Sequence, residues 1–544
     1  MKKCMLIFPP LTPLNDIKNP YSYLLFSKEQ VLVPYSLLSI ASYCSKKGNY
    51  EFSILNLSLE YSKLADQQIA DFDYETFLFE ILKKSILDFK PDLVGISSLA
   101  DHSLIHIELI SSKIKKISSS IVIVAGGNPV TNHPKETLNT DVDGIALGSG
   151  EEPMLHLLES KDYISFLNKS DEWITKNSFA KSYNKNLFTK LDEIYPMHWD
   201  LLDLSEYIRL FPRTRGIFLK EGKKGINIFS SRGCPFLCTF CSSHSVHGRK
   251  VYNISLEPFL NEIEFLHKTH GIEYFSIDDD IFNADKKRLI KLLRSVRKIS
   301  PSIEIECPSG FAISLMDEEM ISVLKETGFK WVQIAIESGN QETLKSIRKP
   351  LKLEKAVDII NLLQKYEIYT RAFFILGIPG ETKEQMKNTI DFMLCNRINW
   401  CSISLAKPLG GSEMYATCLE NNYLKNNAAG YLSENRACIN TLDFTSDEVD
   451  GIVYDANILV NFVNNYDLFR GGRPENAIIG FDNVLGCVPT HPFALFYKTL
   501  ALKRLGYAGK AKECLEKFDN VIEEKSVFDD LVRKYGLREK RKEL

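Results

Sequence analysis

The stretch SSRGCPFLCTFCSS, residues 230–243, holds three cysteines within eight positions: Cys234, Cys238 and Cys241. A tetrahedral zinc site uses four protein ligands, which commonly come as two pairs of closely spaced cysteines. A disulfide framework pairs its cysteines and belongs mainly to small secreted domains. The spacing C-x3-C-x2-C fits neither arrangement, so these three thiols indicate a different kind of site.

Length and composition describe the setting of this stretch. The chain has 544 residues, 44% of them hydrophobic and 25% charged, which predicts about three globular domains. The formal charge of −3 gives no reason to expect a nucleic-acid partner or an anionic membrane. No window approaches the ~18 apolar residues of a membrane span, and the N-terminal apolar run is too short for a signal peptide. We expect a cytoplasmic protein, in which clustered cysteines indicate a metal or redox site.

Residues 1–165 alternate between apolar strands and helices with a helical period. The helices are expected at 34–48 and 106–118. The strands are expected at 4–10, 51–57, 91–99, 121–129 and 143–153. This alternation predicts an open parallel sheet of the Rossmann-like kind, whose ligands lie beyond the carboxyl ends of the strands.

Three of these strands end in small residues, at Ser97–Ser98, Gly126–Gly127 and Gly148–Glu151. Each pair alone is typical of an ordinary tight turn. Three at successive strand ends are better explained by a large flat ligand that approaches the backbone.

Together with the opening strand and its proline pair, the segments PYSLLSIASY, VGISS, VAGGNP and LGSGEEP resemble the cobalamin-binding domain that precedes many radical S-adenosylmethionine (SAM) domains. The resemblance implies that cobalamin is contacted at the strand ends by Ser97, Ser98, Gly126, Gly127, Gly148, Gly150 and Glu151. The D-x-H-x-x-G signature that supplies a histidine to cobalt elsewhere is absent, because DHSLIH at 101–106 lacks its spacing and its glycine. We infer that no protein histidine binds cobalt.

A connector is expected at 166–225, followed by a second strand–helix alternation over 226–425. Its strands are expected at 226–231, 273–280, 303–310, 331–339, 369–381 and 401–411. Six such units predict a partial (β/α)6 barrel of the TIM type, whose site lies at the strand ends.

The cysteines follow the first strand of this barrel, and GIPGE follows the fifth. This combination is identified as the signature of the radical SAM superfamily. It implies that Cys234, Cys238 and Cys241 hold three irons of a [4Fe-4S] cluster. The fourth iron stays open for the amino and carboxylate groups of SAM, and a fourth cysteine would block it.

The same resemblance assigns further residues to SAM. It implies contacts to the adenine from Phe240 and from the fifth strand, to the ribose from the fourth strand, and to the methionyl ammonium from the acidic run 278–280. The residues so assigned are Phe240, Asp279, Asp280, Glu337, Ser338, Ile375 and Gly377. A helix cap is the alternative role for the acidic run, although Asp285 is better placed for it. His244 and His247 are expected in a loop or beside the substrate, not on iron.

Residues 426–544 are expected to be helical, and they contain a repeat. Gly472 and Gly506, and Ala477 and Ala511, are each 34 residues apart, the period of tetratricopeptide repeats. Such arrays need at least three repeats, and only about one and a half are visible. A helical cap on the barrel is therefore favoured over a peptide-binding groove.

The family resemblance implies a cobalamin-dependent radical SAM methyltransferase that acts on a small molecule or a peptide. A 5′-deoxyadenosyl radical would activate an unactivated carbon, and methylcobalamin would supply the methyl group. A flavodoxin or a ferredoxin would donate electrons. Two alternatives stay open: a cyclase or rearrangement enzyme of the same family, and an interaction protein that docks a carrier or peptide through its helical tail. For methyl transfer, the two sets of strand ends must face each other across one cavity, with the tail to one side, closing it or guiding a substrate.

Overall fold

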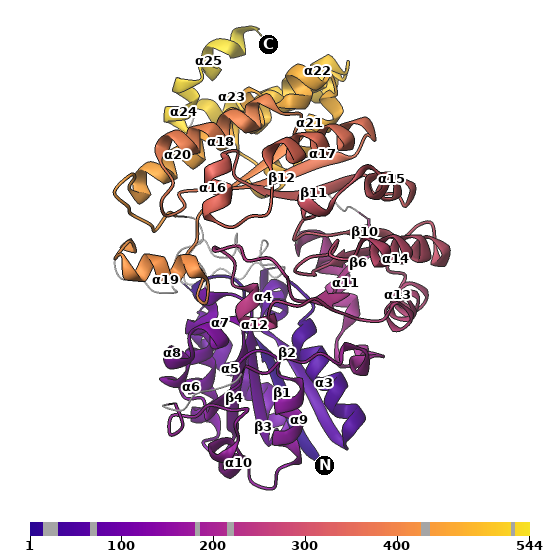
Figure 1. Ribbon diagram of the computed structural model, residues 1–544, viewed down its shortest axis with the longest axis vertical. Helices are drawn as coiled ribbons and strands as arrows, with labels where there is room; N and C mark the ends of the chain where they lie inside the picture. The colour runs from indigo at the N-terminus through magenta and orange to yellow at the C-terminus, as the bar shows by residue number, and fades with distance from the viewer. Residues whose placement is uncertain are drawn as a thin grey trace.

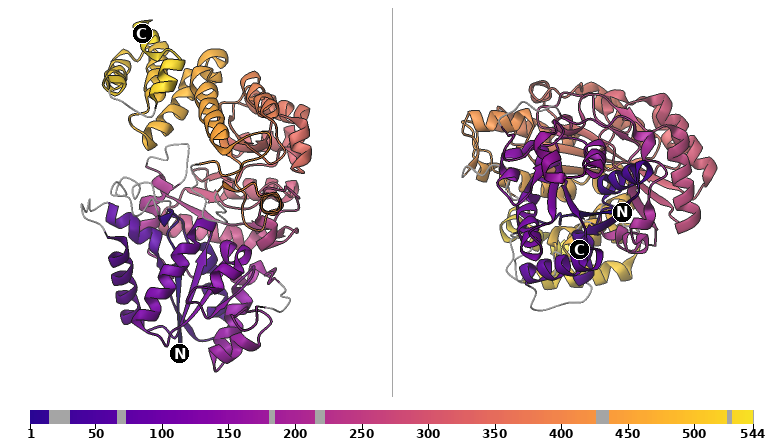
Figure 2. Two further views of the ribbon diagram at one scale, coloured as in Figure 1. Left: turned by 90° about the vertical axis from the view of Figure 1, so that its left-hand side faces the viewer. Right: turned by 90° about the horizontal axis from the view of Figure 1, so that it is seen from below.

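A computed structural model describes residues 1–14, 31–65, 73–179, 185–214, 222–425, 436–523 and 528–543. The chain forms three parts that follow one another along the long axis of the molecule (Figure 1). The N-terminal sheet lies at one end, the barrel strands lie in the middle, and the last helices lie at the other end. A second view gives the same order (Figure 2).

The N-terminal part is a five-stranded parallel sheet in the order β2-β1-β3-β4-β5. Its strands are β1 (Lys2–Phe8), β2 (Tyr50–Asn56), β3 (Leu93–Ser98), β4 (Val122–Gly127) and β5 (Gly144–Ile145). The strand order reverses between β1 and β3, and ligands of open α/β sheets bind at such a switch point. The predicted Rossmann-like fold is confirmed.

Helices cover both faces of this sheet because its strands are apolar on both sides. Leu6 and Phe8 face the core shared with α3 (Tyr35–Lys47) and α9 (Glu151–Glu159). Met5 and Ile7 face α5 (Tyr74–Phe89) and α6 (Leu104–Ile117) on the opposite side. This alternation is the two-residue period of a strand. The shorter helices here are α4 (Leu57–Ala65), α7 (Asn128–Asn132), α8 (Pro134–Leu138) and α10 (Tyr163–Lys169).

The second alternation builds two three-stranded parallel sheets, β10-β9-β6 and β11-β12-β13. A parallel bridge between Phe311 and Ile334 joins them, so the six strands follow one another in chain order as in a partial barrel. The strands are β6 (Gly225–Ile228), β9 (Tyr274–Ile277), β10 (Glu304–Glu306), β11 (Trp331–Glu337), β12 (Tyr369–Leu376) and β13 (Trp400–Leu405). The barrel expectation is confirmed.

Helices between these strands bury apolar faces against the barrel. They are α13 (Leu256–His270), α14 (Lys286–Ile299), α15 (Glu318–Glu326), α16 (Gln341–Ser346), α17 (Leu353–Lys365) and α18 (Lys383–Cys395). Asp285 caps α14, because its side chain accepts a hydrogen bond from the amide of Arg288. The helix α11 (Leu204–Thr214) in the connector and α19 (Glu413–Glu420) after β13 complete this part.

The C-terminal helices cover the beginnings of three barrel strands. Trp400 and Tyr369 open β13 and β12, and both are buried in one core with Phe481 and Phe493, while Trp331, which opens β11, packs partly buried against it. The helices are α20 (Ser446–Ile458), α21 (Pro474–Cys487), α22 (Pro492–Arg504), α23 (Ala508–Glu523), α24 (Asp529–Lys534) and α25 (Leu537–Lys540). The favoured role as a cap on the barrel is therefore confirmed.

The expected place of this tail was wrong in one respect. In the described part of this tail, the first helix approaches the carboxyl ends of the strands, where Val449 packs close to Gly377. The repeat-like helices α21–α23 lie at the opposite end of the barrel (Figure 1), because their apolar surface matches the aromatic residues that open the strands. Among the helices of the described ranges, none has the length and apolar character of a membrane crossing.

Two adjacent glycines at the end of β4 give a matched test of the strand-end geometry. Gly127 has φ +97°, and a Cβ atom there would lie 2.3 Å from the carbonyl oxygen of Ser98. At Gly126 the nearest atom to such a Cβ is 3.7 Å away. We expect Gly127→Ala to lower the free energy of unfolding by about 2–5 kcal/mol, and Gly126→Ala to leave it nearly unchanged. Denaturant unfolding measures both, and equal effects would contradict the assigned backbone geometry.

Candidate functional site

A cavity of about 470 Å³ lies where the N-terminal sheet meets the barrel. The sheet contributes most of its predicted strand-end residues, and the barrel contributes one cluster cysteine and one aspartate of the acidic run. These are Ser97, Gly126, Gly127, Gly148, Gly150, Glu151, Cys241 and Asp280. The two sets of strand ends therefore face one cavity where the first two barrel strands end, whereas residues 337–339 and 377–381, which we also expected there, are not among its lining residues.

The sheet side of the cavity is shaped for a flat ligand. It spans the β1–β3 switch point, with Phe8 and Ser97 in its wall. At Gly148, where φ is +81°, a Cβ atom would lie 2.3 Å from the carbonyl oxygen of Asn186. Because neither Gly127 nor Gly148 can carry a side chain, the backbone itself forms the floor. Such a floor fits a corrin ring, and none of the lining residues from this sheet is a histidine.

The cysteine loop begins with a turn that requires glycine. After β6 the chain forms β7 (Ser231–Arg232), which pairs antiparallel with β8 (Tyr252–Asn253). Gly233 follows with φ +92°, and a Cβ atom there would lie 2.1 Å from the carbonyl oxygen of Lys250. This turn directs Cys234 and the residues after it away from the hairpin.

Two neighbouring aspartates hold this loop in place. The buried Asp279 carboxylate accepts hydrogen bonds from the amides of Ser230 (2.6 Å) and Ser231 (3.0 Å), and from both hydroxyls. Asp280 accepts from the amide of Gly233 (2.8 Å) and from the hydroxyl of Ser243 (2.6 Å). The residues on either side of the cysteines are therefore held by two carboxylates that directly follow β9.

The middle of the loop is held by two helices. The amide of Thr239 donates to the carbonyl of Ile347, and the amide of Met414 donates to the carbonyl of Thr239. Phe240, the next residue, packs partly buried against the barrel core. The loop is thus positioned from three sides before any cofactor binds.

All three cysteines of the loop are free and partly exposed. Burial raises the pKa of the Cys238 thiol to about 11, and nearby Lys349 opposes the rise. Burial also raises the pKa of Cys234 and of Cys241. Metal binding would have to displace these protons, since the thiolate is the ligand. The thiols lie close enough for the charge of one to raise the pKa of another.

Lys349 is a buried cation beside these thiols that the sequence did not single out. Its ammonium lies 2.9 Å from a carboxylate oxygen of Glu337. Burial disfavours the charged lysine, but Glu337 and the thiols of Cys238 and Cys234 raise its pKa. A positive charge here offsets the negative charge of a thiolate cluster. The contact from Glu337 to a ribose stays a prediction. In this structure the Glu337 carboxylate is paired with Lys349.

The donor set fits an iron–sulfur cluster. The three thiols lie on one loop beside a buried lysine, and cysteine thiolates are the usual ligands of such clusters. Within the described ranges, no three His, Cys, Asp or Glu side chains are grouped around the position of one metal ion.

The fourth and fifth strands end near each other through buried polar contacts. The hydroxyl of Ser338 lies 2.9 Å from that of Thr389, and Ser338 is fully buried. Gly377 has φ +83° and begins the GIPGE turn. Ile375 precedes it and is partly buried against the core. Ser338 at the end of the fourth strand is therefore held against the α18 helix, which follows the GIPGE turn.

Three predicted cofactor contacts stay predictions, although their side chains have other partners in this structure. Asp279 is saturated by its serine partners, so it supports the cysteine loop and does not face the cavity. Ser338 is turned to Thr389 on α18. The hydroxyl of Ser98 is hydrogen-bonded to Ser103 and does not line the cavity. In each case a small polar residue at a strand end serves the packing of its own loop.

Several cavity residues were missed by the sequence analysis. Arg232 and Asn227 line the cavity from the barrel side, next to Asp278 of the predicted acidic run. His247 lines it too, which agrees with the expected place beside a substrate, whereas His244 does not. Arg232 had one recognisable signal, as the single charge in an otherwise small and apolar stretch that leads to the first cysteine.

A second cavity of about 570 Å³ adjoins the first. The two share Leu99, Asn128, Ser242 and Leu409. Its other wall is formed by the end of β13, with Ser404 and Lys407, and by Val453 of α20. Because the two cavities adjoin, two ligands could lie side by side at the barrel mouth, one in each cavity.

Family comparisons agree with this division of the chain. Residues 23–158 match the B12 binding domain, and residues 228–393 match the radical SAM superfamily. The chain is a cobalamin-dependent radical SAM enzyme. Its cofactors are a [4Fe-4S] cluster, SAM and cobalamin.

Curated relatives of this radical SAM enzyme include proteins named for two reactions. An uncharacterised methyltransferase of Pyrococcus horikoshii is 27% identical over 412 residues, which are 72% of this chain and 83% of the relative. An anaerobic magnesium-protoporphyrin IX monomethyl ester cyclase of Rubrivivax gelatinosus is 26% identical over 318 residues, which are 57% of this chain and 55% of the relative. Among solved structures, the radical SAM methyltransferase TsrM of Kitasatospora setae aligns with a TM-score of 0.62 at 15% identity. The alignment covers 94% of this chain and 99% of that one.

Glu381 of the GIPGE turn makes the radical SAM domain sensitive to pH. One oxygen accepts from the amides of Gly377 (2.9 Å) and Ile378 (3.2 Å), while Oε1 has no partner among the described residues. Burial raises the pKa of Glu381 to about 7, against about 4.3 in an unfolded chain. The folded state therefore binds this proton more tightly. The contribution of this proton to the free energy of unfolding is fully present below about pH 4 and is lost as the pH rises through 7.

We expect Glu381→Gln, which resembles the protonated acid, to remove this loss. Between pH 5 and pH 8 the wild type should lose about 2–3 kcal/mol of unfolding free energy at this group, and the variant should not. Urea unfolding at both pH values measures the difference. Glu384→Gln, on the exposed side of α18, is the control. A wild-type-to-variant difference that is equal at both pH values would contradict the prediction.

Proposed function

We propose that this enzyme transfers a methyl group from cobalamin to an unactivated carbon of a small-molecule or peptide substrate. The observation that supports this most strongly is the first cavity, whose wall is formed both by the glycine-rich strand ends and by Cys241 of the cysteine loop. When bound, the reduced cluster supplies the electron that cleaves SAM, and cobalamin supplies the methyl group.

The residues of the chain have separate tasks in this proposal. Cys234, Cys238 and Cys241 hold the cluster and leave one iron open. Phe240, Ile375 and Gly377 present backbone to the adenine, and Asp280 faces the cavity where the methionyl ammonium would lie. We propose an electron donor of the flavodoxin or ferredoxin type as the partner.

Part of the cavity wall is apolar. Ile40, Met154, Val246 and Leu409 are among its lining residues, and a reactive intermediate beside them would meet C–H surfaces. Excluding water from an active site protects such intermediates from side reactions. The second cavity leaves room for a substrate next to the cofactors.

A cyclisation is the second candidate, favoured by the similarity to the magnesium-protoporphyrin ester cyclase. It would use the same two domains without net methyl transfer. The two reactions are separated by the fate of the methyl group of SAM, which enters the product only in the first.

The test uses the full-length protein with its cluster reconstituted without oxygen, hydroxocobalamin, a reductant and SAM that carries a trideuterated methyl group. Incubated with extracts of small molecules and peptides, it should produce a compound heavier by one trideuteromethyl group, detected by mass spectrometry. Consumption of SAM with a product of unchanged label content would instead support cyclisation.

Replacing the three loop cysteines by Ala should abolish both the iron–sulfur absorption and the formation of 5′-deoxyadenosine. The reason is that no other cysteines in the described chain share this loop. Cys395→Ala and Cys487→Ala, at two exposed cysteines, serve as controls and should keep a full cluster. A normal cluster in the triple variant would refute the assignment.

We also expect bound cobalamin to lack a protein histidine on cobalt, because the D-x-H-x-x-G signature is absent and no described residue that lines the cavity from the sheet side is a histidine. Electron spin resonance of the cob(II)alamin form measures this directly. A superhyperfine pattern from a coordinated nitrogen would contradict the expectation.

A further inference from the structure

Arg232 links the cysteine loop to the N-terminal sheet. It lies in β7, two residues before Cys234. Its guanidinium is 2.8 Å from a carboxylate oxygen of Glu151, at the start of α9. It also donates to the hydroxyl of Ser39 on α3 (3.1 Å), and that hydroxyl donates to Glu151 (2.6 Å). The three side chains form a closed polar triangle across the boundary between the two parts.

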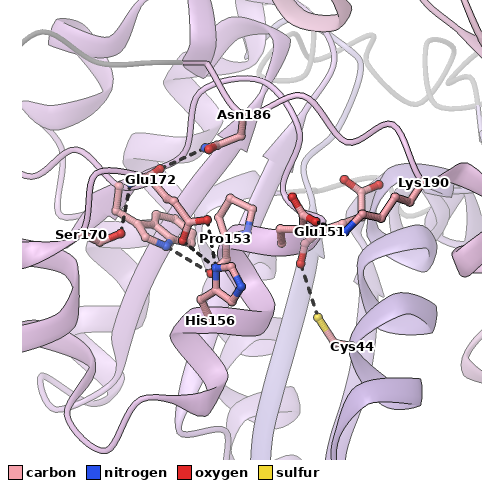
Figure 3. A network of polar contacts seen from close by, with 10 residues as sticks. Cys44, Glu151, Pro153, His156, Ser170, Glu172, Asn186 and Lys190 are labelled. Atoms are coloured by element: carbon pink, nitrogen blue, oxygen red, sulfur yellow. Dashed lines mark hydrogen bonds and ion pairs between the residues drawn. The ribbon is translucent and has the colours of Figure 1, made fainter.

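This triangle is buried on the sheet side. The side chain of Glu151 is 2% exposed and that of Arg232 is 14% exposed. The main chain of Glu151 is fixed as well, since its carbonyl oxygen accepts from the thiol of Cys44 at 3.8 Å (Figure 3). Further along α9, the carbonyl of Pro153 accepts from the indole of Trp173, and His156 contacts Glu172. Glu151 is therefore a rigid anchor for Arg232.

Each end of the ion pair continues into a different part of the site. Glu151 directly follows Gly150 and lies three residues after Gly148, and both glycines line the cavity. Arg232 directly precedes Gly233, whose amide is held by Asp280. The pair is thus the short connection between the loop proposed for cobalamin and the loop proposed for the cluster.

Both partners also line the cavity, so a ligand that fills it covers them. Covering the pair removes the remaining water, which strengthens the attraction between the two charges. The gain in attraction would stabilise the arrangement of both loops. Since an equilibrium coupling between two sites is reciprocal, a ligand at either loop would then favour binding at the other.

We propose that Arg232 and Glu151 are positioning residues that couple cobalamin binding to SAM binding, each cofactor tightening the site of the other. This inference rests on the proposed function, because it takes residues 148–151 as a cobalamin loop and residues 234–241 as the cluster loop. The charged groups that line the cavity from the barrel side include His247 and Asp280.

The test measures the affinity for SAM by anaerobic calorimetry on the cluster-reconstituted protein, with and without saturating hydroxocobalamin. In the wild type we expect SAM to bind about 5-fold or more tightly when cobalamin is present. Glu151→Gln and Arg232→Gln should bring this ratio close to one. The double variant E151Q/R232Q should also bind both cofactors independently, and it guards against misfolding of the single variants, because it leaves no unpaired buried charge.

Arg294→Gln is the matched control. It breaks an ion pair with Glu326 (2.9 Å) on the outside of the barrel, where both side chains are half-exposed, and should keep the wild-type ratio. A ratio near one in the wild type, or a wild-type ratio in the double variant, would overturn the inference while each cofactor still binds. Failure to bind either cofactor at all would instead overturn the proposed function.

Discussion

The whole structure depends on a property of parallel strands: all of them end at the same edge of their sheet. The N-terminal sheet and the barrel each gather their strand ends, with their loops, at one edge. The chain brings the two edges together, and one cavity with walls from both is the result. Residues that are more than a hundred positions apart in the sequence, such as Gly127 and Cys241, therefore line the same cavity.

Much of this arrangement could be predicted from the residues. The strands are short apolar runs followed by small residues, and the helices carry a clear period, so both alternations were visible. The cysteine spacing and the GIPGE turn identified the chemistry. The facing of the two edges followed from the need of a short-lived intermediate to meet its partner, not from any local pattern.

The contacts inside the site were harder to predict. Asp279 and Asp280 are adjacent in sequence, yet one is buried against four donors of Ser230 and Ser231 and the other reaches the cavity. Side chains alternate across a strand, but at its end the chain turns, and the period no longer tells which carboxylate faces inward. The pair of Arg232 with Glu151 is non-local, so no spacing in the sequence could reveal it.

The position of the last helices has a consequence for how the chain can be divided. Trp400 and Tyr369 open barrel strands, and they share a core with Phe481, Phe493 and Phe518, while Asn399 is hydrogen-bonded to the buried Asp467. A fragment cut after β13 would present this aromatic surface and an unpaired amide to water. The barrel strands therefore depend on these helices to cover their apolar beginnings: the residues that carry the chemistry and those that the tail shields from water lie at opposite ends of the same strands.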